Sequence, residues 1–119
     1  MTARKARGAA TQAIAAAWFR DHGFPFCTDA GAGRAGRDLL NLIGLAGEVK
    51  ARANLDPLAW IRQAQASAGG DLPFVLFRCN GQGEKTVADW PVIVRLEDFT
   101  ALVRAAGYGT PEQAGDDAA

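Results

Sequence analysis

Residues 36–52 read GRDLLNLIGLAGEVKAR, and this stretch decides how the rest of the chain is interpreted. It sets Asp38, Glu48 and Lys50 among leucines and other apolar residues. Ionised side chains are rarely buried in such surroundings unless they pair or bind a metal. Gly44 divides the stretch into two expected strands, 38–43 and 45–52. The stretch therefore predicts β-structure that carries charged groups.

The spacing of the charged residues predicts where they meet. A tight hairpin around residues 42–44 would place Asp38 nearly opposite Glu48. Cross-strand neighbours have Cβ atoms about 4.5–5.5 Å apart, and two carboxylates at that separation can share one divalent cation. Lys50 shares the strand face of Glu48, whereas Val49 points the other way, into the core. We expect two acids and one ammonium on one face of a sheet.

This combination suits hydrolysis of a phosphodiester. A bound metal ion lowers the pKa of water and polarises a phosphate. The ammonium of Lys50 can orient the attacking water or neutralise the negative charge that develops. A Glu-x-Lys sequence is common by itself, and the alternative is a surface hairpin that holds an ordinary Glu–Lys pair.

The whole chain predicts one α/β domain around this stretch. Its 119 residues are the usual size of a single domain, with 49% apolar and 22% charged residues. The expected order is α-β-β-β-α-β-β-α, with helices over 8–22, 57–69 and 97–106 and further strands over 24–28, 73–79 and 92–96. We expect residues 1–7 to form a basic flexible arm, 8–106 the domain and 107–119 a disordered acidic tail.

The charges are unevenly distributed although the net charge is zero. Residues 1–52 hold eight basic and four acidic side chains, and the remainder holds five and nine. A basic half indicates a side that faces a polyanion such as DNA. The basic residues expected to contact phosphates are Arg4, Lys5, Arg7, Arg34, Arg37 and Arg52.

The sequence also predicts a compartment. No apolar run approaches the ~20 residues of a membrane span. The Ala-rich N-terminal stretch lacks the cleavage site of a signal peptide, so we expect a cytoplasmic protein without membrane contact. Cys27 and Cys79 have neither metal-ligand spacing nor a disulfide framework, and we expect both to be reduced.

The acid at position 38 and the Glu48-Val49-Lys50 triplet resemble the motif of the PD-(D/E)XK nuclease superfamily, where an acid opens one strand and (D/E)-x-K lies in the next. The chain more closely resembles small Holliday junction resolvase-like proteins of actinobacteriophages and their hosts, through RGAATQ, GAGRAGRD, GEVKAR, LAWIRQA and ADWPVIVRLEDF. This resemblance implies a restriction-endonuclease-like fold, in which helices flank a mixed β-sheet with an α-β-β-β-α-β core.

The resemblance also implies an activity. Proteins of this kind are Mg²⁺-dependent endonucleases that hydrolyse phosphodiester bonds in branched DNA during recombination, and Mn²⁺ is expected to substitute. They act as homodimers that nick the two strands of a four-way junction symmetrically. The compartment implied is the cytoplasm of a bacterium or of a phage-infected host, and no small-molecule cofactor is implied.

Roles for individual residues follow from the same resemblance. Asp38 and Glu48 correspond to metal ligands, the Val49 carbonyl to a third ligand, and Lys50 to the catalytic lysine. Archaeal relatives carry a further glutamate on the first helix, where this chain has Gln12.

An amide at position 12 accepts hydrogen bonds from metal-bound water but adds no charge, which leaves the number of metal ions open. Gln63, on the helix after the motif, resembles a glutamine found there in several nuclease branches, and we expect it to contact DNA. The alternative is a polar residue on the solvent side of the helix.

Three other interpretations remain open. Gln12 and the neutral net charge are compatible with a DNA-junction-binding module without catalysis. A sequence-specific, restriction-like endonuclease would use the same chemistry, although only the expected Gly/Arg loop over residues 29–37 and residues 80–91 offer room for base contacts. Finally, the acids of a purely structural α/β protein would do no more than complete the hairpin.

Overall fold

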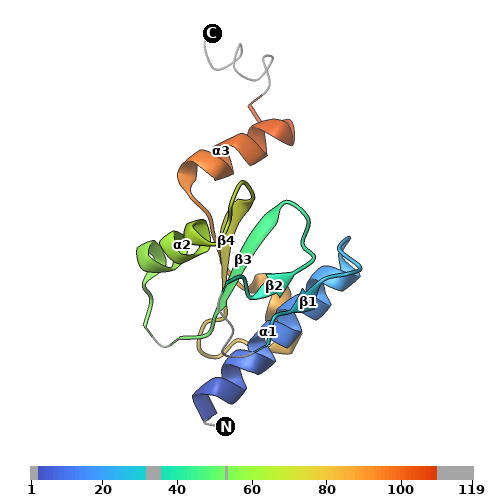
Figure 1. Ribbon diagram of the computed structural model, residues 1–119, viewed down its shortest axis with the longest axis vertical. Coiled ribbons are helices and arrows are strands. Elements are labelled where there is room, and N and C mark those ends of the chain that lie inside the picture. The colour runs from blue at the N-terminus through green and yellow to red at the C-terminus, as the bar shows by residue number, and fades with distance from the viewer. Residues whose placement is uncertain (1–2, 32–35, 53, 110–119) are drawn as a thin grey trace.

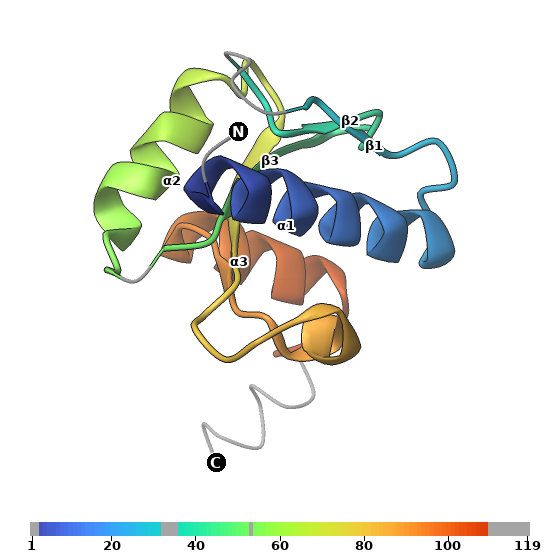
Figure 2. The same cartoon turned by 90° about the horizontal axis from the view of Figure 1, so that it is seen from below.

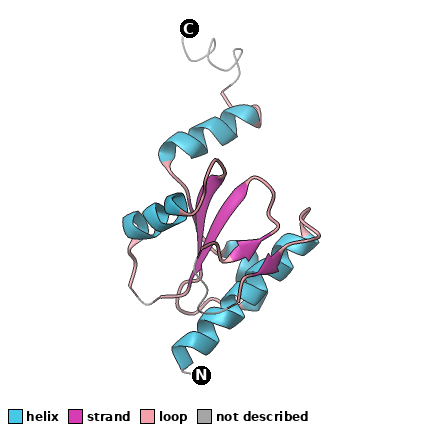
Figure 3. Cartoon of the chain, viewed as in Figure 1, coloured by secondary structure: helices cyan, strands magenta, loops and turns pink. Residues whose placement is uncertain are grey.

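The computed structural model describes residues 3–31, 36–52 and 54–109, which form helices and short strands (Figures 1 and 3). The helices are α1 (Ala3–Asp21), α2 (Pro57–Ala66), the 3₁₀ helix η1 (Glu84–Asp89) and α3 (Leu96–Ala105). The strands are β1 (Thr28–Asp29), β2 (Leu39–Leu40), β3 (Leu45–Lys50), β4 (Leu72–Phe77) and β5 (Val92–Ile93). The predicted α/β class, with helices around a small mixed sheet, is confirmed.

Strand β4 is the centre of the main sheet. It pairs in parallel with β3 and antiparallel with β5. The continuous apolar run over 73–79 predicted this strand, because a strand with both faces covered shows no polar alternation. Two parallel neighbours need a crossover connection, and α2 supplies it between β3 and β4.

The hairpin predicted within residues 36–52 does not form. Strand β2 is shorter than the predicted 38–43, and it pairs antiparallel with β1 instead of β3. The chain turns between β2 and β3 with Asn41 at φ 61° and Gly44 at φ 82°, a left-handed conformation that glycine and asparagine tolerate best. A hydrogen bond from the Asp38 N–H to the Gly47 carbonyl (3.1 Å) nevertheless keeps the start of β2 beside β3.

Two apolar clusters form on the two faces of the sheet, because alternate residues of β4 point to opposite sides. Helix α1 contacts β1 and β3, α2 contacts β3 and β4, and Figure 2 shows both helices beside the strands. The cluster under α2 contains Trp60, Ile61, Ala64, Val75 and Phe77. The cluster under α1 contains Ala15, Ala16, Cys27, Leu39, Leu42, Val49, Phe74, Leu76 and Trp90.

The N-terminal boundaries differ from the prediction. Helix α1 begins at Ala3 rather than at residue 8, so residues 3–7 of the predicted arm are helical. Alanine, arginine and lysine are all good helix formers, which explains the extension. The strand predicted over 24–28 is reduced to β1, because the chain from Gly23, with φ 102°, to Cys27 forms turns.

The C-terminal boundaries also shift. Helix η1 forms inside the predicted loop 80–91, and β5 ends at Ile93 instead of residue 96. Helix α3 follows close to the predicted 97–106, but none of its residues is buried, and Figure 1 shows it beyond the end of the sheet. Most of the predicted tail, residues 110–119, lies outside the described part of the chain. No helix among the described residues combines the length and apolarity that crossing a bilayer requires.

Candidate functional site

The predicted acids and lysine line one polar hollow beside β3. The hollow has a volume of about 190 Å³, and its walls come from α1, the start of β2, the end of β3 and α2. The lining residues are Gly8, Thr11, Gln12, Gly36, Asp38, Glu48, Val49, Lys50, Ala51, Arg52 and Gln63. Residues far apart in the sequence therefore meet here, including every residue predicted as catalytic or as a metal ligand.

Asp38 is held against β3 by two hydrogen bonds. Its Oδ2 accepts from the Val49 N–H at 2.8 Å, and its own N–H donates to the Gly47 carbonyl at 3.1 Å. The Asp38 carboxylate thus accepts from the Val49 N–H, which in the predicted hairpin would donate to a carbonyl of the neighbouring strand. The predicted closeness of Asp38 to Glu48 is confirmed, although a side chain rather than a strand ladder produces it.

Gly47 is required by packing against the next strand. A Cβ atom at this position would lie 2.7 Å from Cζ of Phe74 and 3.2 Å from Cδ1 of Leu39. Carbon atoms do not approach to 2.7 Å without displacement of one of them. The glycine that weakens the motif strand by its flexibility therefore lets an aromatic ring lie on the backbone next to Glu48.

Glu48 is a buried carboxyl with an unpartnered oxygen. Its side chain is 2% exposed, and no described atom hydrogen-bonds to Oε1. Burial raises the pKa of Glu48 to about 7, with the charge and hydrogen bonding of Asp38 contributing to the rise and Lys50 partly offsetting it. Near neutral pH the pair of carboxyls therefore holds a proton that a cation could replace.

Lys50 and Gln63 form a pair that links the motif strand to α2. The Lys50 ammonium donates to Oε1 of Gln63 at 2.7 Å. Val49 packs in the cluster under α1, so the predicted alternation of β3, with Glu48 and Lys50 on one face, is confirmed. Gln63, predicted as a DNA contact, has the lysine as its partner here.

Helix α1 brings an amide to the hollow. Oε1 of Gln12 is buried and has no hydrogen-bond partner among the described residues. The neighbouring Thr11 is fully buried; its hydroxyl donates to the Arg7 carbonyl at 2.7 Å and accepts from Nη1 of Arg78 at 3.1 Å. Arg78, which follows β4, thereby fixes the turn of α1 that presents Gln12.

The donor atoms of the hollow fit a divalent cation. Oε1 of Gln12 and Oε1 of Glu48 are both buried, unpartnered acceptors among the described residues, and both residues line the hollow. A hard cation such as Mg²⁺ takes oxygen ligands of this kind. No cluster of three or more His, Cys, Asp or Glu side chains that could hold a metal occurs in the described ranges. A cation here would therefore draw on two carboxylates, neutral oxygen atoms and water.

Arg37, predicted to contact a phosphate, is held by several hydrogen bonds within the chain. Its guanidinium donates to the carbonyls of Ser67, Leu45 and Ala68 and to the carboxylate of Asp71, the last at 2.7 Å. These four bonds tie the segment before β2 to the turn between α2 and β4. Arg37 therefore helps to position its neighbour Asp38, and its contact with a phosphate stays a prediction.

The other predicted phosphate contacts have different outcomes. Arg52 is exposed and lines the hollow, where a phosphate can reach it. Arg7 has a buried Nη2 atom without a hydrogen-bond partner among the described residues. The side chains of Arg4 and Lys5, and all of Arg34, lie outside the described part of the chain.

Sequence reasoning missed Thr11 and Arg78. A threonine in an Ala-rich helix and an arginine directly after an apolar strand were the available signals, but their pairing depends on the fold. Neither the models of known protein families nor the curated proteins and solved structures give a significant match to this chain. The geometry of the hollow therefore carries the functional argument.

Proposed function

We propose that this chain is a metal-dependent DNA endonuclease of the PD-(D/E)XK type that hydrolyses phosphodiester bonds in branched DNA, as Holliday junction resolvases do. The observation that carries the proposal is the polar hollow in which Asp38, Glu48 and Lys50 meet beside unpartnered oxygen atoms of the described chain. The order α1-β1-β2-β3-α2-β4 is that of the α-β-β-β-α-β core of a restriction-endonuclease-like fold and supports the proposal, although β1 and β2 pair in a sheet of their own. A homodimer on a four-way junction is part of the proposal.

Each residue of the hollow has a defined task in this reaction. Asp38, Glu48 and the Val49 carbonyl would hold Mg²⁺ or Mn²⁺. The Gln12 amide would accept hydrogen bonds from water molecules bound to the cation. A bound cation supplies Lewis acidity to the phosphate and acidifies water. The Val49 N–H fixes the Asp38 carboxylate, so the acids keep their relative position.

Lys50 would act on the charge that develops at the phosphate. One of its three N–H groups donates to Gln63, which leaves the others for a phosphate oxygen or the attacking water. The ammonium is a compact charge, and an oriented charge in a partly buried site stabilises a transition state more than one in water does. Arg52 would bind a neighbouring phosphate at the mouth of the hollow.

One observation favours a second candidate, a junction-binding module without catalysis. The oxygen that α1 contributes belongs to an amide, so the side chains facing the hollow from the described residues supply two carboxylates and no third. Fewer negative ligands weaken the binding of a divalent cation. Binding of a junction without nicking would identify this module.

Cleavage of a synthetic four-way junction tests the proposal. We expect the wild type to nick the junction in Mg²⁺ and to leave linear duplex of the same sequence largely intact. Lys50→Ala should slow nicking by about 100-fold or more, the size typical of losing one oriented transition-state donor. Lys85→Ala, which removes an exposed lysine on η1, is the matched control and should cut like the wild type.

Three outcomes decide between the candidates. Equal cutting by Lys50→Ala and the wild type would contradict the proposed role of the lysine. Tight junction binding without nicks, in Mn²⁺ as well as Mg²⁺, would favour the binding module. A protein that neither binds nor cuts the junction would support the third interpretation, a purely structural α/β protein.

A further inference from the structure

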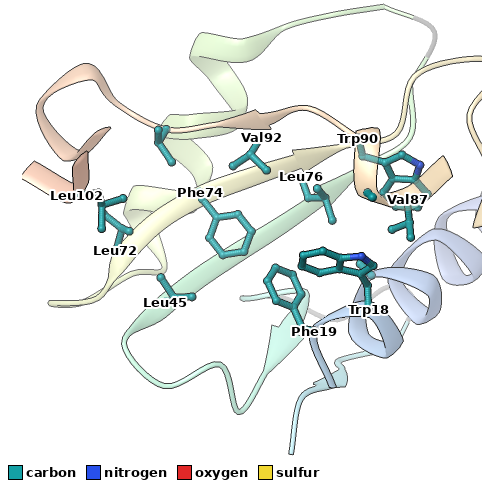
Figure 4. Close-up of a pocket in the computed structure, with 13 residues that line it drawn as sticks. Trp18, Phe19, Leu45, Leu72, Phe74, Leu76, Val87, Trp90, Val92 and Leu102 are labelled. Carbon is teal, nitrogen blue, oxygen red and sulfur yellow. The ribbon is translucent and has the colours of Figure 1, made fainter. Parts of the chain in front are cut away.

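The sheet face under α1 is only partly covered. Beyond α1 lies a second hollow of about 280 Å³, between the sheet, the C-terminal half of α1, η1 and α3 (Figure 4). Its walls are almost entirely apolar and include Trp18, Phe19, Phe74, Leu76 and Trp90. A hollow of this size and character on a protein surface is a site for an apolar partner.

Helix α3 presents apolar side chains that stay about half exposed or more in the described chain. Leu96, Phe99 and Leu102 recur every third position and are 78%, 51% and 48% exposed. This spacing puts them along one side of the helix. A helix of a globular protein normally buries such a stripe, so α3 lacks its packing partner within the described part of a single chain.

The stripe and the hollow belong to one surface. Leu102 lies at the edge of the hollow, and Val92 of β5, 56% exposed, continues the apolar area between them (Figure 4). The exposed parts of Val92, Leu96, Phe99 and Leu102 amount to roughly 400 Å² per chain, as large as the main apolar patch of a typical monomer. Two such surfaces packed together with their hollows would bury about 1,000 Å² or more, the area of a specific interface.

We propose that the occupant of each hollow is α3 of a second copy of this chain, arranged around a two-fold axis. A two-fold interface uses the same patch on both copies, and a patch that carries both a helix and a groove is complementary to itself. This inference gives the homodimer of the proposed function its interface, but it rests on the apolar surface alone.

The same chain offers no equally good occupant among its described residues and its C-terminal sequence. Helix α3 begins soon after β5 ends at Ile93, so the short connection leaves it at one end of its own hollow. Arg95 pairs with Asp98 through two hydrogen bonds of 3.0 and 3.1 Å, which fix the first turn of α3. The C-terminal sequence 110–119, TPEQAGDDAA, has three acidic residues and no large apolar one, so its chemistry does not match the hollow.

Sedimentation equilibrium on the full chain, without DNA or metal, tests this interface. We expect a mass twice the 12.5 kDa of one chain. Phe99→Asp on α3 and Val92→Asp beside the hollow should each raise the dimer dissociation constant at least tenfold. Leu58→Asp changes an equally exposed apolar residue (57%) on α2, outside the surface, and should stay dimeric.

A mixing experiment tests the reciprocal arrangement. In an equimolar mixture of Phe99→Asp and Val92→Asp, a mixed pair keeps one contact in which an unmodified α3 meets an unmodified hollow. The mixture should therefore contain more dimer than either variant alone. Circular dichroism should show an unchanged fold for both, because both positions are exposed.

Clear results would overturn the inference. A wild type that stays monomeric at every concentration, or a dimer that survives both substitutions, contradicts it. A monomer that Phe99→Asp destabilises would show that α3 packs on its own chain. Lys50→Ala should remain dimeric, so failure of the proposed catalysis and failure of this interface give different results.

Discussion

The buried carboxyl of Glu48 makes stability depend on pH. Its pKa of about 7 in the folded chain is above its ordinary value of 4.5, mainly because burial disfavours the charged form. The folded chain therefore binds a proton that the unfolded chain releases between these values. The corresponding stabilisation is fully present below pH 4.5 and is lost as the pH rises through about 7.

We expect the free energy of unfolding of the metal-free protein to fall by roughly 2–3 kcal/mol between pH 4.5 and about 8 because of Glu48. Urea titrations in a chelator measure this loss. The Glu48→Gln variant has no carboxyl to ionise at this position. Its free energy of unfolding should therefore fall by roughly 2–3 kcal/mol less than that of the wild type over the same pH range. A pH dependence that is the same in both proteins would contradict the raised pKa.

Added Mg²⁺ serves as the second control for this prediction. A carboxylate must lose its proton before it binds a metal ion, so stabilisation by Mg²⁺ should grow over the same pH range. Asp38→Asn should greatly reduce the effect of Mg²⁺ on the melting temperature.

Gly47 leads to a prediction about packing. Gly47→Ala should destabilise the fold by about 1–3 kcal/mol, because the new Cβ would overlap the ring of Phe74. Gly70→Ala is the control, since a Cβ there meets open space and should change stability by less than about 0.5 kcal/mol. Urea unfolding of both variants measures the difference, and Phe74→Leu should remove part of the strain in Gly47→Ala. Equal stability of the two alanine variants would contradict the packing argument.

Individual residues were predictable to different degrees. The positions of Glu48 and Lys50 followed from the strict alternation of a strand. The role of Arg37 did not, because its carboxylate partner, Asp71, lies 34 positions away. From the sequence alone, an arginine in a loop before an acid suggests a phosphate contact. The fold adds acceptors within the chain that the sequence does not show.

At the scale of elements, the pairing of β2 shows why strand prediction and strand pairing are different problems. Apolar alternation indicated strands on both sides of Gly44, but it does not specify their neighbours. The chain turns through Asn41 at φ 61°, and β2 pairs with β1 instead of β3. The central strand β4 was predictable, since it places apolar side chains on both faces of the sheet and its run is continuously apolar.

Helix α2 contributes to the proposed reaction through one exposed side chain. Gln63→Ala removes the partner of Lys50, so the ammonium should lose its fixed position and cleavage should slow by about tenfold, less than the full loss of a transition-state donor. Gln65→Ala, exposed on the same helix, should cleave normally. Single-turnover kinetics on a junction compare the two. Thermal melting should show that neither substitution changes stability appreciably, and equal rates would exclude a positioning role for Gln63.

At the scale of the whole molecule, charge and apolar surface are segregated. The polar hollow lies beside β3, between α1 and α2, whereas the apolar hollow lies on the sheet face between α1, η1 and α3. The sequence predicted helices around a sheet but not the isolated position of α3. Periodicity identifies the apolar side of a helix without identifying what covers it.

Junction binding should show this segregation in its dependence on salt. Each phosphate contact adds about 0.9 to the slope of log K against log salt concentration for duplex DNA. Arg52→Ala should therefore reduce the slope by about 1, whereas Lys85→Ala should leave it unchanged. Fluorescence anisotropy in a chelator measures binding without cleavage. The same slope in Arg52→Ala and the wild type would exclude the proposed contact.

The hydrogen bonds of Asp38 have one more consequence. Strand β3 is at the edge of its sheet, and an open edge invites strands of other molecules to add to it, which begins aggregation. Asp38 occupies the Val49 N–H and the Gly47 carbonyl there, so the aspartate that we propose for hydrolysis also protects this edge from such additions. An inactive form for crystallisation is therefore better made by Asp38→Asn, which keeps a side-chain oxygen for this edge, than by Asp38→Ala.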